Sequence, residues 1–128
     1  MTMRRTKAAS GTYSDVVAVE GDVRWIHVAG QLGIDLGGGT AAPPGFAEQA
    51  AIAFDRLEAA LALEGARLEH LVRTTVYVTS FDEWPAFAAI RAERLGASLP
   101  ASTALQVAGL LGGALVEIDA IAAVPAGG

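Results

Sequence analysis

The sequence contains no cysteine and only two histidines, His27 and His70. The lack of cysteine excludes disulfides, thiol nucleophiles and thiolate metal ligands, and it fits the cytoplasmic location that we expect. A Cys–His catalytic pair is also excluded, and two histidines are too few for a typical metal cluster. We therefore expect chemistry that uses no bound metal.

Basic residues are scarce as well. Nine Lys and Arg stand against fourteen Asp and Glu, which gives a net charge of −5. Proteins that bind nucleic acids usually carry a basic stripe, so we expect no nucleic-acid partner. Arg, Glu or Asp interrupts every apolar run before it reaches the roughly 20 residues of a membrane-spanning helix, so we expect no membrane partner either.

The N-terminal segment MTMRRTKAAS carries basic residues but no apolar segment behind them, unlike a secretory signal. We predict a flexible tail over residues 1–10. The length of the remainder fits one domain, over residues 11–128. Half of the chain is apolar (52%), which is enough for a buried core.

Segments rich in β-branched residues predict the first strands. They cover residues 16–19, 23–30 and 72–79. The turn Glu20-Gly21-Asp22 separates the first two segments and predicts that they pair as an antiparallel hairpin.

Two helices are predicted between and after these strands. Apolar residues at helical spacing predict the first over residues 46–64, with Gly65 as its stop. The second is expected to begin at Asp82 as N-cap and to run to about Leu95. That cap places Pro85 in the first turn, where its missing N–H costs nothing.

The last quarter of the chain predicts two further strands, residues 101–108 and 114–124, joined as a hairpin by a small-residue turn at 109–113. The predicted order is β-β-α-β-α-β-β. This order indicates an α+β domain in which two helices pack on one face of a mixed sheet.

Polar side chains alternate along these last two strands. Because successive side chains point to opposite faces, Ser102, Ala104 and Gln106 share one side of the first strand, and Glu117 and Asp119 share one side of the second. One interpretation is an ordinary sheet with a solvated face. The other is a polar pocket whose floor consists of Ser102, Gln106, Glu117 and Asp119.

Four segments, in chain order, carry a resemblance to a known family. They read GTYSDVV (11–17), HVAGQLG (27–33), VRTTVYVTSFDEW (72–84) and PASTALQVAGLLGGALVEIDAIA (100–122). This pattern resembles the RidA (YjgF-like) family of small enamine/imine deaminases. The resemblance implies a chorismate-mutase-like α+β sandwich, a barrel-like homotrimer, and small-molecule ligands bound at subunit interfaces.

The resemblance also implies an activity and a set of site residues. Relatives hydrolyse 2-aminoacrylate or 2-imino acids to 2-oxo acids and ammonia without a cofactor. Glu117 matches the glutamate that is thought to position the attacking water, although a structural ion pair on the sheet is the alternative for it. Tyr13 matches a tyrosine near the cleft, and Gly30 a glycine whose backbone approaches the ligand. Ala104 matches a backbone contact to the ligand carboxylate, and Ser102 falls where the family has the arginine that binds this carboxylate.

The arginine-to-serine difference bears directly on function. A guanidinium binds a carboxylate through a bidentate charged pair, whereas serine offers one hydroxyl. We therefore expect an altered substrate, or little activity on ordinary imino acids; Arg24 and Arg73 are the first candidates if another residue binds the carboxylate. The alternatives are a non-catalytic, ligand-binding or regulatory trimer, and a specialised biosynthetic tautomerase or cyclase. Some RidA-like proteins have been described as ribonucleases, an activity that the acidic balance of this chain disfavours.

Overall fold

The computed structural model describes residues 1–37 and 44–127. These residues form six strands and two α-helices, with short 3-10 turns at Leu68–His70 and Leu111–Gly113. The elements in chain order are β1 (Thr2–Lys7), β2 (Ser14–Glu20), β3 (Val23–Leu32), α1 (Phe46–Ala62), β4 (Leu71–Val78), α2 (Trp84–Leu95), β5 (Ala101–Gln106) and β6 (Val116–Pro125).

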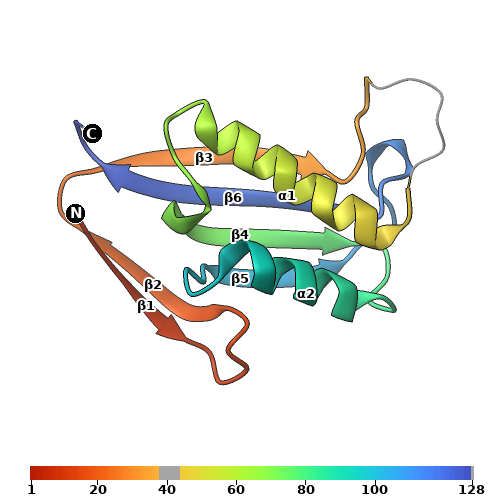
Figure 1. Ribbon diagram of the computed structural model, residues 1–128, viewed down its shortest axis with the longest axis horizontal. Coiled ribbons are helices and arrows are strands. Elements are labelled where there is room, and N and C mark those ends of the chain that lie inside the picture. Colours follow the sequence, from red (N-terminus) through yellow and green to blue (C-terminus); the bar gives the residue numbers. More distant parts are fainter. Residues whose placement is uncertain (38–43, 128) are drawn as a thin grey trace.

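The strands form one mixed sheet in the order β1-β2-β5-β4-β6-β3. Strand β5 runs parallel to both β2 and β4, and the other pairs are antiparallel. Both helices lie side by side across the same face of the sheet (Figure 1). This arrangement confirms the predicted α+β class with two helices on one face. Below, the covered side is called the helix face and the other the open face.

Helix α1 supplies much of the core. Its apolar stripe is fully buried at Ala50, Phe54 and Leu57, as the helical spacing predicted. The stripe packs on Val116 and Ile118 of β6, which belong to the same buried cluster. Burying one side chain of this size contributes about 1.5–3 kcal/mol relative to leaving it exposed.

Helix α2 begins one residue later than predicted. Its N-cap is Glu83, and Pro85 lies in the first turn as expected. Asp82 belongs to the preceding turn, where its backbone N–H donates to Ser80 Oγ at 3.0 Å. Phe87 is fully buried and stacks on Trp84, with 4.8 Å between ring centroids. Neither helix of the described chain has both the length and the apolar character needed to cross a membrane.

Both predicted hairpins are wrong. Strands β5 and β6 do not pair, because β4 lies between them. Strand β2 pairs with β1 and β5, while β3 pairs with β6 at the opposite edge. The physical reason is the β4–α2–β5 unit, because a helical crossover places its two strands side by side in parallel. Strand β2 occupies the other edge of β5, and β6 pairs with the free edge of β4.

The predicted flexible tail is also wrong. Residues Thr2–Lys7 form β1, which pairs antiparallel with β2 from Thr2 opposite Glu20 onward. The guanidinium of Arg4 forms a 3.1 Å ion pair with Glu20 across this pair of strands. The prediction failed because basic side chains were taken as a sign of disorder, whereas edge strands commonly carry Lys and Arg to prevent further strand addition. The observed order is therefore β-β-β-α-β-α-β-β.

Candidate functional site

The central strand β4 determines which side chains face the helices. Thr74 is buried with the hydrophobic residues of the helix face, and β5 places Ser102 directly beside it. The Oγ atoms of Thr74 and Ser102 lie 3.0 Å apart. The residues on either side of this pair point the other way: on the open face Arg73 of β4 donates from Nη2 to Oγ1 of its diagonal neighbour Thr103 at 2.8 Å. Ser102 therefore faces the helices.

Strand β6 presents its carboxylates on the open face. Val116, Ile118 and Ala120 are buried under the helices, so the alternate residues Glu117 and Asp119 point away from them, as the sequence pattern predicted.

The hypothesis of one pocket floor in this chain is consequently wrong. Ser102 and Gln106 belong to the helix face, in register with Thr74 and Val78, whereas Glu117 and Asp119 lie on the open face. The error follows from the wrong hairpin, in which β5 and β6 are direct neighbours. In the structure β4 lies between them, and its register with each strand determines which side chains of β5 and β6 share a face.

The helix face carries a small cavity of about 360 Å³. Its lining combines the loop before β2, strand β5 and one side of α2. The lining residues are Ser10, Thr12, Tyr13, Trp84, Arg91, Ser102 and Ala104. Three predicted ligand-binding residues, Tyr13, Ser102 and Ala104, thus come together from distant parts of the sequence.

Ser14 attaches the loop that carries Tyr13 to the start of β5. Its buried hydroxyl donates to the carbonyl of Leu99 at 2.6 Å. Its backbone N–H donates to the carbonyl of Pro100 at 2.9 Å. These two bonds fix the first residues of β2 against β5, which holds the loop beside Ser102.

Arg91 is the charged residue of the cavity, and the sequence analysis missed it. It is only 7% exposed, and its Cζ lies 5.4 Å from the ring centroid of Trp84 and 5.6 Å from that of Phe87. Burial lowers the pKa of Arg91, and the nearby Tyr13 acts in the opposite direction. The sequence does hold a signal: Phe87, Arg91 and Leu95 are the buried positions of α2 and are spaced four residues apart, so a cation interrupts the apolar stripe.

The two arginines suggested by the sequence do not line this cavity. Arg24 donates from Nη2 to the carbonyl of Glu64 at 3.0 Å, near the end of α1. Arg73 points to the open face, where it donates to Thr103.

The second group of predicted site residues lies on the open face. A Cβ built on Gly30 would come within 1.9 Å of Glu117 Oε1, so any side chain at this position would displace the Glu117 carboxylate. Gly30 lies where the register between β3 and β6 shifts, between Val28 and Gln31. Within residues 1–37 and 44–127, no Lys, Arg or His nitrogen lies within 4 Å of the Glu117 carboxylate, so the structural ion pair considered for it does not form there.

Asp119 is bound by a neighbour on the same face. Tyr77 Oη donates to Asp119 Oδ2 at 2.8 Å. This hydrogen bond, together with burial and the negative charges of Asp119 and Glu117, raises the pKa of Tyr77. Asp119 therefore accepts a fixed hydrogen bond, while Glu117 offers its carboxylate to a ligand or water.

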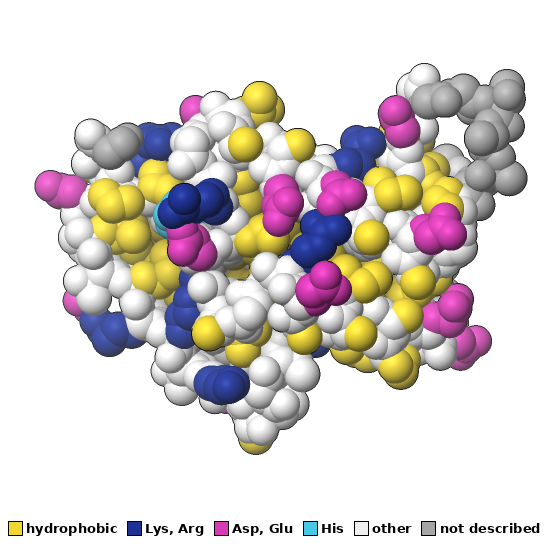
Figure 2. Space-filling view, in the orientation of Figure 1, with side chains coloured by type: hydrophobic (Ala, Val, Ile, Leu, Met, Phe, Trp, Pro, Cys, Tyr) yellow, Lys and Arg dark blue, Asp and Glu magenta, His cyan; other side chains and the backbone are white. Residues whose placement is uncertain are grey.

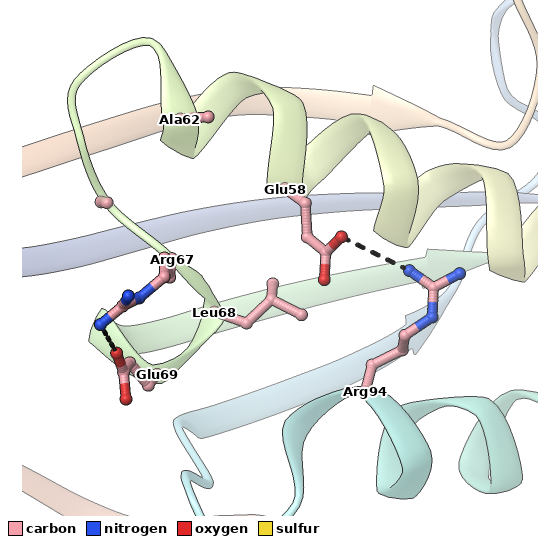
Figure 3. Close-up of a pocket in the computed structure, with 7 residues that line it drawn as sticks. Glu58, Ala62, Arg67, Leu68, Glu69 and Arg94 are labelled. Atoms are coloured by element: carbon pink, nitrogen blue, oxygen red, sulfur yellow. Dashed lines mark hydrogen bonds and ion pairs between the residues drawn. The ribbon is translucent and has the colours of Figure 1, made fainter.

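A larger hollow of about 510 Å³ lies between the end of α1 and α2, but its charges are already paired. Arg94 lies 3.9 Å from Glu58, and Arg67 pairs with Glu69 (Figure 3). Arg94 also lies 2.7 Å from Asp55. On the surface over the two helices, basic side chains stand next to acidic ones (Figure 2). The arrangement fits a solvated ion-pair network better than a site for chemistry.

Comparisons with known proteins agree with this architecture. A family model described as Endoribonuclease L-PSP matches residues 3–124. A 2-iminobutanoate/2-iminopropanoate deaminase of Rattus norvegicus is 36% identical over 118 residues, which cover 92% of this chain and 84% of that protein. The crystal structure of RidA from the Antarctic bacterium Psychrobacter sp. PAMC 21119 superimposes with a TM-score of 0.72 at 31% identity, covering 97% of this chain and 99% of that one. A Rid-family protein of unknown function, YyfB from Yersinia pestis, gives a TM-score of 0.77 at 25% identity, covering 97% of this chain and 100% of that one.

Proposed function

The chain belongs to the RidA (YjgF-like) family, and from that premise we propose that it is a cofactor-free hydrolase that converts a reactive enamine or imine to a carbonyl compound and ammonia. The observation that carries the proposal is the juxtaposition of Glu117 and Gly30 on the open face. Glu117 has no ion-pair partner within residues 1–37 and 44–127, and Gly30 has no side chain, so a small planar ligand can approach both.

The complete site requires two copies of the chain. Tyr13, Ser102 and Ala104 line the cavity of the helix face, while Gly30 and Glu117 lie on the open face. A ligand can contact both groups only if the open face of one copy meets the cavity of another. Apolar side chains on the open face also favour cover by a second copy, since Trp25 is 48% exposed and Leu105 37%. The proposal is therefore a homotrimer with inter-subunit clefts.

The reaction needs a positioned water and one group that exchanges protons. Glu117 accepts a proton from the water as the water oxygen adds to the imine carbon, and it passes this proton to the nitrogen, which gives a neutral carbinolamine. Glu117 then accepts the hydroxyl proton as the carbonyl forms and passes it to the nitrogen, which leaves as ammonia when the carbon–nitrogen bond breaks. No electron is gained or lost overall, which agrees with a reaction that needs only acid–base catalysis.

The substrate is proposed to be held differently from that of arginine-bearing relatives, because Ser102 offers a hydroxyl that already lies 3.0 Å from Thr74 Oγ1. Two other functions are distinguished by experiment: a non-catalytic ligand-binding or regulatory trimer, and a specialised tautomerase or cyclase. The net charge of −5 argues against an RNA substrate despite the description of the family model.

The first test is Glu117→Gln, assayed on imines that an amino-acid oxidase generates from amino acids. General acid–base catalysis typically contributes about 100-fold to 10,000-fold, so we expect a loss of that order in kcat with ligand binding retained. Asp119→Asn is the matched control, since it neutralises a carboxylate on the same strand face. Unchanged turnover in Glu117→Gln would refute the assigned role, and a wild-type protein that binds 2-oxo acids without turnover would favour the ligand-binding alternative.

Mixed assemblies test whether two copies form one site. Ala104→Phe fills the cavity of the helix face, and Glu117→Gln disables the open face, so each variant alone is expected to be inactive. When the two variants assemble together in a ring, about one site in four combines two intact halves. Recovery of about a quarter of the wild-type activity is the expected result. No recovery in verified mixed trimers would show that each site lies within one chain.

A further inference from the structure

Arg91 has an environment that its contacts within the chain do not explain. It occupies a buried position of α2 that its neighbours one turn away, Phe87 and Leu95, fill with apolar side chains. A residue with a purely structural role at this position would be expected to be apolar too. The cation therefore suggests a ligand.

The neighbouring groups offset only part of the cost of burying this charge. The guanidinium lies over the faces of Trp84 and Phe87, which attract a cation through their quadrupoles. An ion pair is lacking: across the described ranges, no carboxylate oxygen lies within 4 Å of Arg91. Buried cations are normally paired with an anion, because stacking on neutral rings does not replace lost hydration.

Arg94, one turn along the same helix, shows the usual solution. Its guanidinium is bound by Asp55 of α1 at 2.7 Å. Glu58 of the same helix lies 3.9 Å from it (Figure 3). The two arginines differ in what surrounds them, since Arg94 faces carboxylates and Arg91 faces a cavity.

The rest of the cavity is suited to an anion. Hydroxyl groups of Ser10, Thr12, Tyr13 and Ser102 line it, and its lining contains no acidic side chain. Hydroxyls can donate to carboxylate oxygens, and a guanidinium donates two parallel bonds to them. The volume of about 360 Å³ has room for a molecule of several heavy atoms.

We propose that Arg91 is the anion-binding residue of this cavity, and that its ligand is the carboxylate of a short 2-imino or 2-oxo acid. This inference rests on the proposed function, and its ligand belongs to the class that a relative's name gives, the 2-imino acids. The new element is the residue that binds the carboxylate. The cation stands on α2, whereas in the family pattern it stands on β5 at the position of Ser102. The small side chain of Ser102 leaves room for the ligand between β5 and α2. Arg91 is thus a specificity-determining residue.

The experiment measures the affinity of 2-oxobutanoate by isothermal titration calorimetry, with its methyl ester as the uncharged probe. Arg91→Met removes the charge and keeps the length of the side chain, and we expect 2-oxobutanoate to bind about 30-fold to 100-fold more weakly. Arg91→Lys keeps a point charge without the bidentate fork, so a loss of about 5-fold to 10-fold is expected. Arg94→Met is the matched control on the same helix, with an affinity within about twofold of wild type.

Four results would overturn the proposal. The first three are equal affinity of Arg91→Met and wild type for 2-oxobutanoate, no preference of the wild-type chain for the acid over its ester, and no saturable binding of the acid at millimolar concentration. The comparison of acid and ester uses only the wild-type chain. An equal affinity for the two would therefore overturn the proposal even if Arg91→Met fails to fold. Arg91 would also lose its assigned role if Arg91→Met lowers only trimer stability, because the cation would then pair with a neighbouring subunit.

Failure of this inference and failure of the proposed function give different results. Arg91-dependent binding of 2-oxobutanoate without turnover of any imine would leave the anion site in place and reject the hydrolase. Turnover that depends on Glu117 but is unchanged in Arg91→Met would leave the hydrolase in place and reject the role of Arg91.

Discussion

Replacing Ser102 with arginine introduces a second guanidinium into the cavity that already contains Arg91. From the sequence alone, Ser102→Arg is expected to restore ordinary imino-acid binding, with Glu117 across the expected hairpin holding the new side chain. The structure removes that support, since Glu117 lies on the open face. We therefore expect Ser102→Arg by itself to be destabilising.

The magnitude follows from Coulomb's law. Two like charges about 6 Å apart, the scale of this cavity, repel by about 3 kcal/mol at an effective dielectric constant of about 20. The larger side chain also displaces the hydroxyl that lies 3.0 Å from Thr74 Oγ1. For a chain of 128 residues, a loss of about 3 kcal/mol lowers the melting temperature by roughly 10 °C.

A double-mutant cycle isolates the repulsion. Ser102→Arg combined with Arg91→Met leaves one guanidinium in the cavity, so we expect most of the lost stability to return and 2-oxobutanoate binding to recover with it. Thermal unfolding of the four proteins at one protein concentration, with and without the ligand, measures both effects. A coupling energy below about 0.5 kcal/mol would refute the reasoning, because the side chains at 91 and 102 would then not share a cavity.

Three further predictions concern the open face and the assembly. Gly30→Ala places a methyl group against Glu117 Oε1, which a Cβ would approach to 1.9 Å. Because the carboxylate is displaced, imine turnover should fall at least about tenfold. Unchanged turnover would show that Gly30 is not part of the site. The raised pKa of Tyr77 means that its hydrogen bond to Asp119 stabilises the fold at neutral pH, and this contribution is lost as pH rises above 10.0 through the folded-state pKa. Urea unfolding should therefore show a steeper loss of stability with rising pH in wild type than in Tyr77→Phe, and equal losses would contradict this prediction. Multi-angle light scattering should report a homotrimer at micromolar concentration, whereas a stable monomer would eliminate the inter-subunit site.

Local patterns along the chain were sufficient to predict much of the fold. The apolar stripe of α1, Pro85 in the first turn of α2 and the alternation of Glu117 and Asp119 with buried residues all follow from contacts within a few residues. Such features depend on the helical and strand periods, which a sequence displays directly. The family motifs likewise indicated the α+β class with both helices on one face.

Strand pairing and the grouping of site residues were decided by the tertiary structure. Whether β5 lies beside β6 depends on the crossover through α2, and that choice alone put Ser102 and Glu117 on opposite faces. The role of Arg91 also depends on tertiary structure. Its spacing from Phe87 predicts burial, but Arg91 lines a cavity only because α2 packs beside the loop that carries Tyr13. Side-chain period is a local property, whereas the neighbour of a strand is selected by competition among distant segments for the same edge.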